Sequence, residues 1–259
     1  MRAGPYGARV TDPLARVAAL PGVAEAADAA RREVDRLLAA RVLRTRSIEV
    51  TAEIALRDAR ASAALDGPVP EVEALRASLD AGQPVGAPVE GALRIAAALG
   101  ELGPVWGSAP RQALARLHVL AAGGTGADVE QLGRPQAGAA VGRRLDLLVE
   151  ALSAPTQAPA VVVAAVVHGE LLDLAAFGAT SGLLARAAAR LVLLDRGVDP
   201  KGVTAPDVGH LAGGYWDAAA AYAAGDVGAW VRHCCAALVT GAQEGLTACD
   251  VVKGRPLQK

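Results

Sequence analysis

Apolar residues recur at helical spacing through most of the 259-residue chain. One apolar stripe runs through residues 34–38, and another extends from Ile48 to Ala63 and stops at Asp66-Gly67-Pro68. Spacing of i, i+3 and i+4 places such residues on one face of a helix, and Gly and Pro mark helix ends. The pattern predicts further helices near residues 70–80, 88–101, 109–122, 137–153, 158–174, 181–196, 214–224 and 227–247.

Strands are almost excluded by the same pattern. No run of four or more residues alternates between β-branched and polar positions, so the most that we expect is a short hairpin near residues 133–141. The sequence therefore predicts an all-α helical bundle. The predicted divisions are an N-terminal arm (1–21), a helical domain (22–250) with N-terminal helices (22–105) and a core (106–250), and a C-terminal tail (251–259).

Composition and charge narrow the classes of function. The formal net charge is −1 and no basic block occurs, so a nucleic-acid partner is not expected. The longest apolar run, residues 158–167, is too short to span a bilayer. No secretory signal opens the chain, and the odd number of cysteines, Cys234, Cys235 and Cys249, favours reduced thiols. We expect a cytoplasmic protein without a membrane partner, and the Ala, Arg, Gly and Val bias is typical of a GC-rich bacterial genome.

The segment from Val166 to Arg190, VVHGELLDLAAFGATSGLLARAAAR, carries the most specific motif of the chain. It resembles the signature HxFx(D/E)GNGRxxR of the Fic (Fido) family, whose members transfer AMP from ATP to a protein hydroxyl. Phe177, Gly182 and Arg186 match the signature. The positions that differ are Ala175 for the histidine, Ala179 for the acid, Thr180 for the first glycine, Ser181 for the asparagine and Leu183 for the first arginine.

Three other segments resemble the same family and follow its order along the chain. RASAALDG, which ends at Gly67, is similar to the inhibitory-helix pattern (S/T)xxxE(G/N), with Ser62 in place and Asp66 where glutamate is usual. LARLHVLAAG (114–123) followed by GRP (133–135) resembles the helix and the segment that lead into the target-binding flap. The aromatic helix, Gly-Asp turn and tryptophan-bearing helix of residues 215–238 resemble the usual end of the domain.

The resemblance implies that most of the catalytic chemistry is missing. In the family the histidine accepts the proton of the target hydroxyl, and the acid holds magnesium between the phosphates. Ala175 and Ala179 can do neither. The turn of Thr180, Ser181 and Gly182 retains part of the phosphate cradle at a helix N-terminus, with Ser181 as a candidate N-cap. With Arg186, these three residues form the predicted anion or nucleotide site, and no catalytic residue is predicted.

Two residues are predicted to keep structural roles from the family pattern. Arg186 corresponds to the arginine that binds the terminal phosphate or is held by the inhibitory glutamate. We therefore predict a salt bridge between Asp66 and Arg186; the alternative is that Arg186 is a solvated arginine and Asp66 only ends its helix. Phe177 is predicted to anchor the motif in the core.

Other candidate sites fail on spacing. His168 and Glu170 form an HGE triplet similar to that of zinc deaminases, but no PCxxC follows, and no pair of histidines has ligand spacing. No metal site is therefore predicted. GGTGAD (123–128) lacks the GK(S/T) of a phosphate-binding loop and is read as an interhelical turn.

Three functional readings follow. The first is a catalytically degenerate Fic-like binding or regulatory module for an unidentified protein partner. This reading requires no cofactor but leaves ATP or another phosphate ligand open. The second is a divergent transferase of a nucleotidyl or phosphate-containing group that uses Glu170, Asp173 or His168 as substitutes. The third is a structural helical protein that assembles along its Ala-rich faces, which also leaves a homo-oligomer open.

Overall fold

The computed structural model describes residues 12–255, which form twelve α-helices and three short 3₁₀-helices. In chain order these are α1 (Pro13–Ala18), α2 (Val23–Leu38), η1 (Arg41–Arg44), α3 (Ser47–Asp66), α4 (Val72–Asp80), α5 (Ala87–Ser108), α6 (Pro110–Ala122), η2 (Val129–Gln131), α7 (Ala139–Ser153), α8 (Ala160–Leu174), η3 (Gly178–Thr180), α9 (Ser181–Asp195), α10 (Pro206–Leu211), α11 (Tyr215–Ala223) and α12 (Val227–Gly254). No strand occurs within these residues, so the all-α prediction is confirmed for them.

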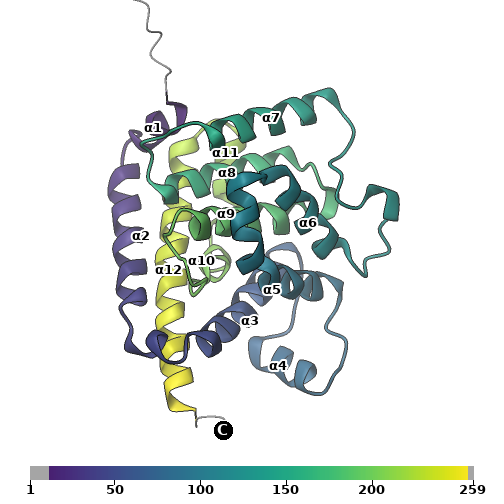
Figure 1. Cartoon of the computed structure of the whole chain (residues 1–259), viewed down its shortest axis with the longest axis vertical. Coiled ribbons are helices and arrows are strands. Elements are labelled where there is room, and N and C mark those ends of the chain that lie inside the picture. The colour runs from purple at the N-terminus through teal and green to yellow at the C-terminus, as the bar shows by residue number, and fades with distance from the viewer. Residues whose placement is uncertain (1–11, 256–259) are drawn as a thin grey trace, which may run out of the picture.

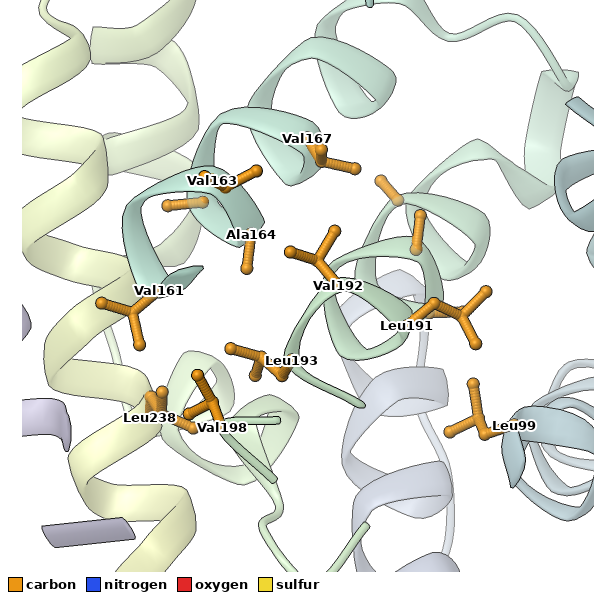
Figure 2. Packing of buried hydrophobic residues seen from close by; sticks show 14 of the residues in the cluster. Leu99, Val161, Val163, Ala164, Val167, Leu191, Val192, Leu193, Val198 and Leu238 are labelled. Carbon is orange, nitrogen blue, oxygen red and sulfur yellow. The ribbon is translucent and has the colours of Figure 1, made fainter. Parts of the chain in front are cut away.

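Helices α8 and α9 pack against each other in the centre of the bundle (Figure 1). Helix α8 is apolar on nearly every side, which is the pattern of a helix buried on all faces. In Figure 2, Ala164 and Val167 of α8 face Val192 of α9, while Leu191 lies toward Leu99 of α5. Burial of each valine and leucine side chain of this layer contributes about 1.5–3 kcal/mol, so the layer fixes α9 and the motif turn that precedes it.

The long helix α12 supports this centre from one side and runs beside α2 (Figure 1). Glycines allow its backbone to approach its neighbours. A Cβ on Gly241 would lie 2.6 Å from the backbone oxygen of Ala205, next to α10, and one on Gly245 would lie 2.5 Å from the backbone oxygen of Val203. Helix α10 is thereby held directly against α12.

Helix α3 crosses the bundle and delivers its C-terminal end to the start of α9. Half of its residues are buried, because α5, α10 and α12 pack around it. It ends at Asp66, where Gly67 adopts an extended backbone and Pro68 follows. A residue before proline is disfavoured in the α region, so the sequence fixes where this helix stops.

Several sequence-based boundaries do not coincide with the ends of helices. Residues 13–18 of the predicted arm form α1, since the Asp12 carboxylate accepts from Ala15 N at 3.0 Å as an N-cap and Pro13 occupies the first turn. Residues 1–11 of the arm lie outside the described residues. The division at residue 105 falls inside α5, which continues past Pro104 to Ser108. The tail does not begin at 251, because α12 continues to Gly254, and residues 256–259 are outside the described range.

The predicted hairpin is also absent from the described chain. Residues 133–138 form a loop, and α7 begins at Ala139. This loop does make one strand-like contact, since Gln136 N donates to the carbonyl of Ala176 at 2.7 Å. The loop that follows α8 is therefore held by the loop of residues 133–138, whose first residues resemble the segment that leads into the target-binding flap of the Fic family. Among residues 12–255, no helix is both long and apolar enough to cross a membrane.

Candidate functional site

Arg186 lies at the centre of the candidate site, one turn after the start of α9, with its side chain fully buried. Its Nε donates to Ser62 Oγ at 2.8 Å, and Nη2 donates to the Ser62 carbonyl at 3.0 Å. Nη1 is 3.4 Å from the Tyr215 hydroxyl. A buried guanidinium is stable only when its donors are satisfied, and here groups of the protein itself satisfy them.

The salt bridge predicted between Asp66 and Arg186 is present. Asp66 Oδ2 accepts from Arg186 Nη2 at 2.6 Å, and Oδ1 is 3.4 Å from Nη1, so the contact is bidentate. The Asp66 side chain keeps 30% of its surface exposed. The bridge thus joins the end of α3 to the start of α9 and has one side open to water.

The absence of a side chain at Gly182 makes room for this bridge. A Cβ there would lie 2.9 Å from Asp66 Oδ1 and 3.0 Å from Arg186 Nη1. Gly182 is in the first turn of α9, where unpaired backbone N–H groups and the helix dipole favour a negative charge. The Asp66 carboxylate therefore lies against the first turn of α9, the segment at which the resemblance predicts a phosphate site.

Two further carboxylates lie behind Arg186. Asp207 Oδ2 is 3.7 Å from Arg186 Nε, and Asp58 Oδ2 accepts from Arg190 Nη1 at 2.7 Å. The second oxygen of Asp58 accepts from the backbone N–H of Asp207 at 2.9 Å. Burial and the neighbouring Asp207 carboxylate raise the pKa of Asp58 to about 7, and burial also raises the pKa of Asp207.

Burial alone would lower the pKa of Arg186, but Tyr215, Asp207 and Asp66 together raise it above its ordinary value. The guanidinium is therefore charged at every pH at which the protein is folded.

The motif turn before α9 is tied together by its own side chains. Phe177 N donates to Ser181 Oγ at 2.9 Å, and the Thr180 hydroxyl donates to the Phe177 carbonyl, also at 2.9 Å. Ser181 is buried and helical, so its prediction as the N-cap is wrong: Thr180 holds that position, without a capping bond from its side chain. The hydroxyls of Thr180 and Ser181 are thus both engaged in hydrogen bonds to the backbone of Phe177.

Phe177 and Ala175 fix the position of this turn. Phe177 is buried and lies 5.1 Å, centroid to centroid, from the ring of His118, whose Nδ1 accepts from Gly133 N at 3.1 Å. Ala175 ends α8 with φ 49°, in the left-handed region, which costs a non-glycine residue about 1 kcal/mol. The position that corresponds to the histidine of the family signature is therefore a sharp turn that carries only a methyl group.

Known proteins resemble this chain in three-dimensional structure and not in sequence. No protein-family model matches the chain, and no curated protein sequence matches it. Among solved structures, a Fic family protein from Desulfovibrio desulfuricans G20 superposes with a TM-score of 0.72 at 18% identity, covering 92% of this chain and 77% of that chain. The chain has the Fic fold. Fic-1 from C. elegans superposes with a TM-score of 0.65 at 16% identity, covering 89% of this chain and 73% of that chain.

Within the Fic fold, the residues considered as catalytic substitutes have other partners. Glu170 accepts from the Tyr222 hydroxyl at 2.7 Å and from Arg144 at 2.9 Å. Asp173 pairs with the same arginine at 2.9 Å. His168 is buried, and its Nε2 lies 2.9 Å from the hydroxyl of Tyr215. None of these groups is a free base directed toward the motif turn.

The sequence interpretation missed Asp58, Asp207 and Tyr215 as members of the site. A signal for Asp58 was present, because residues 58, 62 and 66 are spaced by four on α3, as Arg186 and Arg190 are on α9. Two helices with such matched polar rows can pair them across their contact. Asp207 and Tyr215 had no comparable signal, since both reach the site through α10 and α11 from distant parts of the chain.

Proposed function

We propose that this Fic-fold protein is a binding or regulatory module that acts on a protein partner without transferring a nucleotide. The observation that carries the proposal is the engagement of Arg186. Its donors are taken by Asp66, Ser62 and Tyr215, and its side chain has no exposed surface. The group that would recognise a terminal phosphate is used as a structural link between α3 and α9.

The loss of reactive groups supports the same proposal. A general base contributes roughly 10²–10⁴-fold to a proton-transfer step, and Ala175 has no proton acceptor. An electrophilic group near the developing charge contributes about 10²–10³-fold, and Leu183 stands where the signature has an arginine. Ala179 supplies no oxygen for magnesium. These losses act on the same transition state.

The predicted phosphate site at Thr180, Ser181, Gly182 and Arg186 is, on this proposal, closed by Asp66 in the resting protein. The two hydroxyls bind Phe177, and the carboxylate covers the first turn of α9. A phosphate would have to displace Asp66, and it would also have to compete with a bidentate charge pair that needs no ordering of a separate molecule. Because the Asp66–Arg186 bridge holds α3 and α9 together, the protein would present a rigid surface to its protein partner.

Thermal denaturation with a panel of nucleoside triphosphates, with and without magnesium, tests this proposal. We expect no shift in Tm for the wild-type protein. Asp66→Ala removes the competing carboxylate and is the variant most favourable to a phosphate, and Asp35→Ala, an exposed residue on α2, is the matched control. A magnesium-dependent rise in Tm of the wild-type protein would contradict the proposal and favour the transferase alternative.

A further inference from the structure

Three side chains from three helices converge beside the buried arginine. One ring nitrogen each of His168 (α8) and His210 (α10) and the Sγ of Cys234 (α12) all lie within 4.8 Å of one another. Both histidines are buried, and Cys234 is partly buried. Three of the chain's four histidines gather here, since His233 also contacts His210.

Each of the two histidines has a hydrogen-bond partner on one ring nitrogen. His168 Nε2 lies 2.9 Å from the hydroxyl of Tyr215, and His210 Nδ1 lies 3.1 Å from His233 Nε2. Each bond uses one ring nitrogen of its histidine, which leaves the other nitrogen, His168 Nδ1 or His210 Nε2, as the candidate ligand atom. A partner on the far nitrogen fixes the tautomer and the ring orientation of a ligating histidine.

A small cavity beside the three side chains has room for a single ion. His168, His210 and Cys234 line this cavity of about 30 Å³, together with Arg186, Arg190, Asp207 and several apolar side chains. That volume exceeds the roughly 10–15 Å³ needed for one water molecule and is far below the several hundred Å³ of a small-molecule pocket. The cavity is therefore of the right size for an ion with a water beside it.

The charges around the cavity also permit a cation. Arg186 and Arg190 are the positive groups of the buried cluster, and Asp58, Asp66 and Asp207 are its carboxylates. The carboxylates offset the positive charges of Arg186 and Arg190 beside the cavity. Because the pKa of Asp58 is raised to about 7, they leave no fixed surplus of negative charge.

We propose that His168, His210 and Cys234 bind a zinc ion. Two imidazoles and one thiolate are a ligand set suited to Zn²⁺, with a water in the fourth, tetrahedral position. Binding converts the Cys234 thiol to a thiolate and releases its proton to solvent, while both imidazoles bind in the neutral form. The site is separate from the magnesium position that the Fic signature implies at Ala179, and it would join α8, α10 and α12 directly.

The ligands must move slightly for this to occur. Metal–ligand distances of about 2.0–2.1 Å for nitrogen and 2.3 Å for sulfur place tetrahedral ligands roughly 3.3–3.7 Å apart. The side chains would therefore close by about 1 Å from the arrangement described here. Rotation of the Cys234 side chain, the least buried of the three, is the simplest source of that movement.

Titration of the chelator-treated full-length protein with Co²⁺ tests the proposal. Cobalt replaces zinc in tetrahedral sites and reports a bound thiolate through charge-transfer absorption. We expect this absorption to saturate at about one Co²⁺ per chain, to disappear on addition of Zn²⁺, and to be lost in Cys234→Ser and in His210→Asn. Cys235→Ser and His118→Asn, which alter a neighbouring thiol and a histidine outside the cluster, should retain it.

A second measurement covers the case in which a variant folds poorly. Zn²⁺ should raise the Tm of the wild-type protein and of Cys235→Ser by several degrees and leave that of Cys234→Ser unchanged, because only a ligand of the folded state stabilises it. Absence of the cobalt band in the wild-type protein overturns the proposal. So does a band of equal intensity in Cys234→Ser, because the metal would then be bound elsewhere.

Discussion

Gly182 and Asp66 fit together because residue 182 lacks a side chain. A Cβ at that position would lie 2.9 Å from Asp66 Oδ1, which is closer than a carbon and a carboxylate oxygen normally approach in van der Waals contact. The glycine shared with the Fic signature thus accommodates a carboxylate of the chain itself. The consequences of this arrangement can be measured at single residues.

Gly182→Ala should lower the free energy of unfolding by about 1 kcal/mol or more. Alanine favours helix by up to about 1 kcal/mol, but its methyl group forces the Asp66–Arg186 pair apart, and overpacking typically costs about 1–3 kcal/mol. Gly142→Ala is the matched control on α7, since a Cβ there has no atom within 4 Å. Urea denaturation should show the two substitutions acting in opposite directions, and equal gains in stability would contradict this account.

Arg186→Ala should destabilise the protein by about 3–5 kcal/mol, because it leaves Asp207 and Asp66 without their counter-charge in a buried site. Asp66→Asn should cost less, since that side chain is 30% exposed and the amide can still accept from the guanidinium. Arg143→Ala, on the exposed face of α7, should change stability by less than about 0.5 kcal/mol. Chemical denaturation of the three variants measures this ranking.

Asp58→Asn should remove a pH-dependent part of stability. The pKa of Asp58 is raised to about 7 in the folded protein. Between its ordinary value and that pKa, the folded state holds a proton that the unfolded state has lost. The free energy of unfolding contributed by this group is thus full at low pH and falls as pH rises through about 7.

The pH dependence of the wild-type protein must be compared with that of Asp58→Asn, because other buried groups make stability rise with pH. Burial lowers the pKa of His168 and of His210, so their contribution to stability rises with pH. The wild-type protein should therefore lose stability relative to Asp58→Asn, by on the order of 2 kcal/mol, between about pH 5 and about pH 7.5. A difference between the two proteins that does not vary with pH would disprove the assigned pKa.

Ala175→Gly should stabilise the protein by up to about 1 kcal/mol. Ala175 has φ 49°, and glycine adopts this conformation without the steric cost that alanine carries. The gain is reduced by the larger entropy of glycine in the unfolded chain. Thermal denaturation would show the effect, and a loss of more than about 1 kcal/mol would mean that the methyl group packs in a way this account has not recognised.

The sequence predicted the helices of the core well because their apolar periodicity is strong. Helices α8 and α9 begin and end within about two residues of the predicted ranges. Helix α10 was missed, since six residues carry too little periodicity. The helix predicted near residues 88–101 is longer than expected, because α5 continues past Pro104 to Ser108.

The candidate site was predictable only where a local motif existed. Asp66 and Arg186 could be paired through the family pattern, although 120 residues separate them. Asp58 and Arg190 are 132 residues apart and belong to no motif. The histidine and cysteine cluster draws on three helices whose packing determines which side chains meet, and spacing along a single chain does not contain that information.

Incubation of the purified chain with ATP, magnesium and lysate proteins, followed by mass spectrometry, tests most directly whether this Fic fold lacks transfer activity. We expect no nucleotidyl or phosphoryl adduct on the chain or on other proteins above the level seen with heat-denatured chain. Adducts that require both ATP and magnesium and accumulate with time on the addition of wild-type protein would contradict this expectation.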